Sequence, residues 1–250
     1  MKKIGFAIGL LLVLGVAVWM LRGKPAPLIM GTHAHFPPFE MLQPVGEGEE
    51  IVGFDVELAQ AIAAKTGRPL TIIDMPFDDL IPALDAGTID MALVAMSMTD
   101  ERAQRVDFSE PYYTATQVVL IRAGDAPPTT REDLSTWPIA AQTGTTSAAL
   151  ALDIAGADNV RQTTSAKAAI VDLLNSQVNA VLIDEQPAAA FRKIFPEAHI
   201  IPLPFPEEYY AVAVRKGNKP LLKLINATLR DIKADGRYDW FIDRWLVQAN

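Results

Sequence analysis

Residues 84–102, "LDAGTIDMALVAMSMTDER", decide the fold prediction, because they lead from a helix end through a buried strand to a polar segment. Gly87 is typical of a helix C-terminus, and the apolar run at residues 89–95 predicts a buried strand. Ser97 and Arg102 follow that strand. An arginine in a charged turn is usually a surface residue, but ligands of open α/β sheets bind beyond the carboxyl ends of the strands. The stretch therefore predicts a strand that presents Ser97 and Arg102 at its functional end.

A second segment repeats this pattern later in the chain. Residues 173–184, "LLNSQVNAVLID", align without a gap with residues 84–95, "LDAGTIDMALVA". Both segments have the character of a helix end, a polar turn and a buried strand. The weak repeat predicts two similar α/β lobes, and it aligns Asp184 with Ala95. Two such lobes that face each other would enclose a cleft between their strand ends.

Alternating apolar runs and amphipathic segments predict an α/β fold for the chain from residue 28 onward. Short apolar runs at residues 28–31 and 70–74 predict strands. Asp55 is a suitable N-cap for a helix between them, and Asp78 or Asp79 opens a second helix.

Two extended segments, residues 117–123 and 209–218, are expected to cross between the lobes. This places residues 28–116 plus 209–250 in the first lobe and residues 117–208 in the second lobe. The C-terminal part is expected to be helical and to pack its apolar stripe on the first lobe, through Leu222, Ile225, Leu229 and Ile232 and then Trp240, Phe241, Trp245 and Leu246.

The composition is that of a globular acidic protein. The 250 residues are 50% hydrophobic and 21% charged, with a formal net charge of −8. A chain of this size buries a substantial core. Nonspecific binding to nucleic acid or to anionic lipid needs basic patches, so the charge argues against both classes of partner.

The first 27 residues have the character of an export segment. Lys2 and Lys3 precede an uncharged run at residues 4–21. The run is longer than a typical signal-peptide core and shorter than an average membrane span, so a cleaved signal peptide and a retained transmembrane helix both stay open. Either one predicts a periplasmic or extracytoplasmic body. The chain has no cysteine, which excludes disulfides, thiolate catalysis and a lipid-modified cysteine anchor.

Sequence motifs of enzymes are scarce. The chain has no G-x-S-x-G, no H-E-x-x-H and no phosphate-binding G-x-x-x-x-G-K-[ST] motif. His33 and His35 have the spacing of metal ligands on an extended segment, but no third ligand of matching spacing lies nearby. We therefore predict no catalytic residue, no metal and no other cofactor.

The segment "QTGTTSAAL" at residues 142–150 leads from a strand through a glycine turn into a helix. Thr145, Thr146 and Ser147 stand at the start of that helix. Free N–H groups and hydroxyls at a helix start can bind an anion, but ordinary N-capping by a threonine or serine explains the same pattern. The residues alone leave both interpretations open.

The segment "HAHFPPFE" at residues 33–40 follows the first strand. We expect Phe39 to belong to the core. Phe36 is closer to the strand end and is a candidate for the apolar wall of a pocket. Phe77 stands at the equivalent junction of another strand and helix and is a candidate for the same role.

In their order along the chain, these segments resemble the periplasmic solute-binding proteins for polar amino acids, the family 3 extracellular binding proteins of ABC importers. The resemblance covers residues 28 to 246, and its longest motif is the most specific. The matching segments are "FPPFE", "VGFDVELAQAIA", "DDLIPALDAGTIDMALVAMSMTDERAQRVDFSEPYY", "QTGTTS", "AVLIDEQPA", "AVAVRKGN" and "LRDIKADGRYDWFIDRW".

The resemblance implies a two-lobed periplasmic-binding-protein fold of the type II kind, with two crossing strands and an amino acid bound in the cleft. Arg102 would hold the α-carboxylate through its planar fork. Ser97 and the region of Thr145 and Thr146 would add hydrogen bonds to that carboxylate. Asp184, opposite Ala95 in the repeat, would receive the α-ammonium group.

The family pattern also implies how the ligand's side chain is read, with Phe36 and Phe77 on its two faces. Many relatives that select a basic amino acid have an acid where this chain has His33. With Gln142 also near the pocket, His33 makes a neutral polar ligand such as glutamine plausible, while arginine stays open, and the sequence does not choose between them. The implied partners are a small polar amino acid and an ABC permease in the cytoplasmic membrane, and we expect a monomer.

Two other functions compete with a transport receptor. Some relatives with this fold resemble cyclohexadienyl or arogenate dehydratases, for which Glu185 or His33 would be the acid-base candidates. A membrane-anchored amino-acid sensor is the second, although the chain has no second apolar segment and no output domain.

Overall fold

The computed structural model describes residues 25–247. The predicted export segment at residues 4–21, with its signal-peptide and membrane-anchor alternatives, lies outside these residues. No helix within residues 25–247 is both long and apolar enough to cross a membrane.

The first lobe is built on a five-stranded mixed sheet. β1 runs parallel to β5 and β6, and β15 runs antiparallel to β6 and β7. The strand order is β5 (Leu70–Asp74), β1 (Leu28–Thr32), β6 (Met91–Ala92), β15 (Ala213–Arg215) and β7 (Val106–Phe108). The helices of this lobe are α2 (Phe54–Thr66), α3 (Leu80–Ala86), α4 (Asp100–Arg105), α8 (Lys219–Ala234) and α9 (Arg237–Ile242).

The second lobe repeats this spatial order and these strand directions, although the fourth strand in the order comes first along the chain in this lobe and last in the first lobe. β10 runs parallel to β11 and β12, while β9 runs antiparallel to β12 and β13. The order is β11 (Val160–Thr163), β10 (Ile139–Gln142), β12 (Ala180–Asp184), β9 (Gln117–Arg122) and β13 (Ala198–Ile201). Its helices are α5 (Thr146–Ala155), α6 (Ala166–Leu174) and α7 (Glu185–Ile194). The predicted two-lobed α/β fold is confirmed, and β6 and β12 from the repeated segments are the central strands of their sheets.

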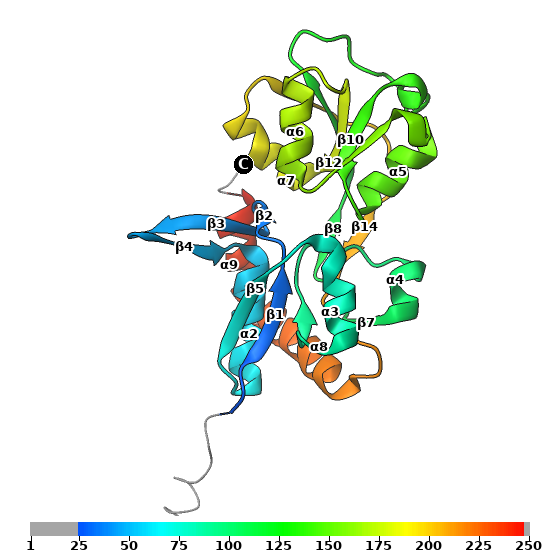
Figure 1. Cartoon of the computed structure of the whole chain (residues 1–250). Helices are drawn as coiled ribbons and strands as arrows, with labels where there is room; N and C mark the ends of the chain where they lie inside the picture. The colour runs from blue at the N-terminus through cyan, green and yellow to red at the C-terminus, as the bar shows by residue number, and fades with distance from the viewer. Residues whose placement is uncertain (1–24, 248–250) are drawn as a thin grey trace, which may run out of the picture.

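A two-stranded antiparallel ribbon joins the lobes (Figure 1). It consists of β8 (Tyr113–Ala115) and β14 (Glu208–Tyr210). The prediction that residues 117–123 make the crossing was wrong, because their apolar side chains are buried in the second sheet as β9. Of residues 209–218, only residues 209 and 210 belong to the ribbon, and residues 213–215 enter the first sheet as β15. The lobe boundaries at residues 117 and 209 stay a prediction.

A small three-stranded sheet sits beside the first lobe and projects from it (Figure 1). It contains β2 (His35–Phe36), β3 (Glu40–Val45) and β4 (Gly48–Val52). Phe39, between β2 and β3, is fully buried, as predicted. Through Phe39, the small sheet that follows β1 is therefore joined to the hydrophobic core of the first lobe.

The C-terminal helices cover the core of the first lobe as expected. Ile225, Leu229 and Ile232 of α8 are buried with the side chains of α2 and β1, because their spacing places them on one face of the helix. Trp240 departs from this pattern: its side chain is 51% exposed, and its ring contacts the guanidinium of Arg244.

Local details near the strand ends differ from the sequence prediction. Gly53, with φ of 141°, is the N-cap of α2, so the carboxylate of Asp55 is buried inside the lobe and does not cap the helix. The strand expected at residues 89–95 is regular only over β6, and Ala95 has a φ of 48°. This turn of the backbone redirects the chain toward Ser97.

Candidate functional site: a pocket between the lobes

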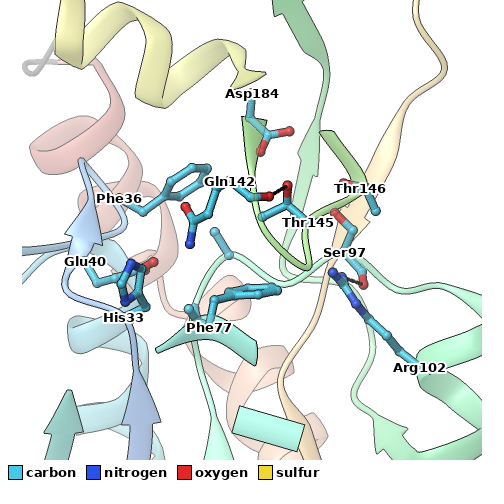
Figure 2. A pocket seen from close by; sticks show the side chains of 12 residues that line it. His33, Phe36, Glu40, Phe77, Ser97, Arg102, Gln142, Thr145, Thr146 and Asp184 are labelled. Carbon is cyan, nitrogen blue, oxygen red and sulfur yellow. Dashed lines mark hydrogen bonds between the residues drawn. The ribbon is translucent and has the colours of Figure 1, made fainter. Parts of the chain in front are cut away.

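A pocket lies between the two lobes. All ten residues that were predicted as ligand-binding line it, and Glu40 and Val94 join them (Figure 2). The predicted residues are His33, Phe36, Phe77, Ala95, Ser97, Arg102, Gln142, Thr145, Thr146 and Asp184.

The lining residues come from the ends of secondary-structure elements in both lobes. His33 directly follows β1, while Gln142 and Asp184 are the last residues of β10 and β12. Thr145 and Thr146 stand at the start of α5. Because parallel strands end at the same edge of a sheet, these polar side chains gather at one place.

Arg102 connects the two lobes at one end of the pocket. Its backbone N–H donates to the hydroxyl of Thr99, which caps α4. Its guanidinium donates to the carbonyl of Ser97 at 2.6 Å and, across the cleft, to the carbonyl of Gly144 at 2.9 Å. The guanidinium also lies 5.3 Å from the ring centre of Phe77. Burial lowers the pKa of Arg102, although an arginine stays charged at neutral pH.

The two threonines at the start of α5, for which the sequence left N-capping and ligand binding open, make different hydrogen bonds. Thr145 is the N-cap: its hydroxyl accepts from the N–H of Ala148 at 3.2 Å. The hydroxyl of Thr146 donates to Glu208 at 2.7 Å instead. Only Thr146 therefore directs its hydroxyl away from the helix and toward the cleft.

Glu208, on the joining strand β14, collects hydrogen bonds from both lobes. Its carboxylate accepts from the hydroxyls of Ser97 and Thr146 and from the side-chain amide of Gln117. The sequence analysis missed Glu208, because nothing in "PEEYY" separates it from a surface acid. It places an additional negative charge behind the residues that line the Arg102 end.

Asp184 is the second charged residue at this end of the pocket. Its carboxylate accepts from the amide of Gln117 at 2.8 Å. Burial, and then the negative charge of Glu208, raise the pKa of Asp184 to about 7. A cation placed beside Asp184 would hold this carboxylate in its charged form.

At the other end of the pocket, Glu40 is fully buried, its carboxyl group lies within hydrogen-bond reach of the carboxyl group of Asp55, and neither of its oxygens accepts from a donor group within residues 25–247. Burial, and then the neighbouring charge of Asp55, raise the pKa of Glu40 well above its usual value. The sequence analysis missed Glu40, although it lies in the quoted motif "FPPFE". An acid directly beside a buried phenylalanine was the available signal.

His33 lines the same pocket as Glu40 and is only 8% exposed (Figure 2). Its Nδ1 lies 3.1 Å from the carbonyl of Met75, which can only accept, so Nδ1 carries the hydrogen. Burial lowers the pKa of His33, which keeps the ring neutral at neutral pH. Its Nε2 is then an acceptor, and this buried atom has no partner among the described residues.

Phe36 and Phe77 supply the aromatic surface between these two ends (Figure 2). The rings of His33 and His35 contact edge to face, with their centres 5.0 Å apart. Across residues 25–247 no group of three or more histidine, aspartate or glutamate side chains is arranged to hold a metal ion. The site thus has a cation and an acid at one end, aromatic rings in the middle and acceptors at the other end.

Known proteins with a similar sequence or structure give the site its context. The family model of the bacterial extracellular solute-binding proteins, family 3, matches residues 28–248. The ABC transporter arginine-binding protein 1 of Escherichia coli (strain K12) is 32% identical over 223 residues, which cover 87% of this chain and 90% of that protein.

Two solved structures share the fold and contain different ligands. An amino acid ABC transporter substrate-binding protein from Streptococcus pneumoniae, bound to L-arginine, matches with a TM-score of 0.84 at 32% identity and covers 90% of this chain and 96% of its own. An ancestral arginine-binding protein bound to glutamine matches with a TM-score of 0.82 at 37% identity and covers 89% and 99%. The chain belongs to family 3 of the bacterial extracellular solute-binding proteins, and it is an amino-acid-binding protein of an ABC importer and not an enzyme.

Proposed function

We propose that this chain captures a cationic L-amino acid, arginine above all, and delivers it to an ABC permease. The observation that carries the choice of ligand is the wall formed by Glu40 and His33. Two buried acceptors without donors, one of them a carboxylate, meet at the end of the pocket opposite Arg102 and Asp184. Burial makes ionisation of Glu40 costly, so a bound cation would favour its charged form and gain a strong partner.

Arg102 and Asp184 are proposed to bind the part that all α-amino acids share. The guanidinium has five N–H donors and uses two of them on backbone carbonyls, which leaves donors for a carboxylate. Asp184 would receive the α-ammonium group, whose charge favours the ionised carboxylate. Ser97 and Thr146 already donate to Glu208, so the ligand's carboxylate must either share or replace Glu208 as their acceptor.

The side chain of the ligand is proposed to lie between Phe36 and Phe77 and to end at Glu40 and His33. A guanidinium is planar, stacks on aromatic faces and donates from every nitrogen. Neutral His33 accepts one of these hydrogens without repelling the charge. Glu40, on β3, would thereby take the role of the acid that many relatives selecting a basic amino acid have at the position of His33.

A neutral ligand fits this wall less well. The side-chain amide of glutamine can donate to both acceptors but brings no charge to compensate Glu40. Between the neutral and cationic ligands that the sequence leaves open, we therefore propose a cationic amino acid. The chain is extracytoplasmic, as its family is, and we further propose that it acts as a monomer, exported by its first 27 residues or tethered through residues 4–21.

Isothermal titration calorimetry of the full chain, in a mild detergent that keeps residues 4–21 in solution, tests this function. The panel contains the twenty amino acids, citrulline as the neutral isostere of arginine, prephenate and arogenate. We expect arginine to bind most tightly and citrulline at least tenfold more weakly, as for the loss of one charge-assisted contact. Tightest binding of glutamine would refute the cationic class, and formation of product from prephenate would refute the receptor.

A further inference from the structure

Glu40 and Asp55 form a pair of buried carboxylates behind the pocket. Both side chains are fully inaccessible to solvent. One oxygen of Asp55 accepts from the N–H of Ala95 at 2.7 Å and from the hydroxyl of Tyr112 at 2.8 Å. The other oxygen of Asp55 and both oxygens of Glu40 have no donor among the described residues. Three of the four carboxylate oxygens can thus be hydrogen-bonded only through a proton that the two carboxyl groups share or by a molecule in the pocket.

The other charged or titratable groups that face the pair do not compensate its charge. Asp74, on β5, adds a further negative charge. His33 is held neutral, and Tyr112 is a neutral donor to Asp55. Arg102 lines the same pocket, but its guanidinium is engaged by Ser97 and Gly144 at the opposite end.

Two carboxylates in such surroundings do not both ionise near neutral pH. Burial disfavours each charge, and each charge disfavours the other. A proton held between them also satisfies oxygens that otherwise have no donor. In agreement with this geometry, burial raises the pKa of Asp55 to about 7 and the pKa of Glu40 well above its usual value. The ligand-free pair therefore retains one proton.

We infer that a cationic side chain entering the pocket expels the proton that Glu40 and Asp55 share, so that capture of the ligand is coupled to proton release. The inference rests on the proposed function, since it needs a ligand whose cation reaches Glu40. The incoming positive charge replaces the proton as the partner of the pair, and the proton passes to the buffer. The affinity for a cationic ligand then rises with pH until the ligand-free pair is already ionised.

Other groups at the site also exchange protons and must be separated from the pair. Asp184 has a pKa raised to about 7, so it releases protons when any α-ammonium group binds beside it. His33 is neutral at pH 7 and contributes none there. Arginine and citrulline share the α-amino acid part, so the difference between their proton counts isolates the side-chain end.

The experiment is calorimetry of the full chain at about pH 7 in phosphate and in Tris, whose ionisation enthalpies differ. The dependence of the binding enthalpy on the buffer gives the number of protons released. We expect arginine to release more protons than citrulline, by as much as about one per ligand. As the pH rises from about 5.5, the ratio of arginine to citrulline affinity should rise by up to about tenfold per pH unit for as long as the ligand-free pair retains its proton.

Glu40→Gln should abolish the additional protons of arginine, because the amide cannot be titrated. Glu49→Gln, which removes the same charge from the exposed strand β4, should keep them. Equal proton counts for arginine and citrulline in the unaltered chain would overturn the inference and leave arginine binding intact. Failure of arginine to bind would instead overturn the proposed function. The comparison of ligands on the unaltered chain decides the matter even if Glu40→Gln does not fold.

Discussion

The two ends of the pocket differ in how far their polar groups are satisfied. At the end formed by Arg102, Ser97, Thr146 and Asp184, each side chain already has a hydrogen-bond partner within the protein. At the end formed by Glu40 and His33, three buried polar atoms have none in the described structure.

This difference separates two tasks of one site. The first end is held in place by bonds that cross between the lobes, so its geometry is prepared for the constant part of any amino acid. At the second end, the buried acceptors lack hydrogen-bond donors and a compensating positive charge. This end therefore favours a ligand side chain that supplies both and disfavours other side chains. We therefore expect substitutions at the first end to weaken all ligands, and substitutions at the second end to change their ranking.

Arg102→Ala should have the largest effect. Loss of a buried charge-assisted anchor is expected to weaken binding of every amino acid ligand by about 2 to 4 kcal/mol. Calorimetry with arginine and citrulline measures it. Arg105→Ala is the matched control, because Arg105 lies on the same helix but pairs with Asp85 at the surface. An unchanged dissociation constant would show that Arg102 does not bind the ligand. A loss of affinity confined to arginine would show that Arg102 recognises the ligand's side chain and not its α-carboxylate.

Glu40→Gln should change the ranking of ligands. We expect arginine to lose about 1.5 to 3 kcal/mol of binding free energy, the usual range for a hydrogen bond to a charged group, while citrulline loses much less. Competition titrations with both ligands measure the difference, and Glu49→Gln again controls for net charge. Equal losses for the two ligands would show that the two ends are not specialised as we describe.

The stability of the ligand-free protein should depend on pH in a way that reports the buried acids. The folded pKa of Asp55 and Asp184 is raised to about 7, above the unfolded value of 3.8. Their ionisation therefore opposes folding, and stability falls as pH rises from about 4 through about 7. The fall is on the order of 1 kcal/mol or more for each group, since one pKa unit is about 1.4 kcal/mol.

Thermal denaturation at about pH 5.5 and pH 8 measures this fall, and Asp184→Asn should reduce it. Saturating arginine should raise the melting temperature more at pH 8 than at pH 5.5. A ligand-free melting temperature that is equal at both values, or higher at pH 8, would contradict the assignment of raised pKa values to these carboxylates.

Gly144→Ala should have a smaller effect that is specific to the contact between the lobes. A Cβ atom at Gly144 would lie 1.8 Å from the carboxylate of Asp78 in the other lobe, although that side chain can move. Gly156, also with a φ of 75°, faces open space. Both substitutions should lower stability through backbone strain, by about 1 to 3 kcal/mol, but only Gly144→Ala should also weaken arginine binding. Equal affinities of the two variants would show that the lobes bind the ligand without this close approach.

Much of the fold was predictable from short-range patterns. Strand and helix periodicity and the repeat of residues 84–95 in residues 173–184 predicted two similar lobes, and both repeated strands are central in equivalent sheets. The crossing segments were misplaced, because an apolar β9 and an exposed connector have the same extended pattern. Only pairing with β12 and β13 buries β9 in the second sheet.

Ten of the twelve pocket residues were also predictable, since they follow strand ends or stand at a helix start. The sequence by itself determined the family, the two α/β lobes and the end of the pocket with Arg102 and Asp184, because these depend on local periodicity and on motifs that are continuous in the chain. Only the tertiary structure decided the other end. The roles of Glu40 and Glu208 depend on which distant groups surround them, and burial turns acids that would be ordinary at the surface into the groups that govern binding.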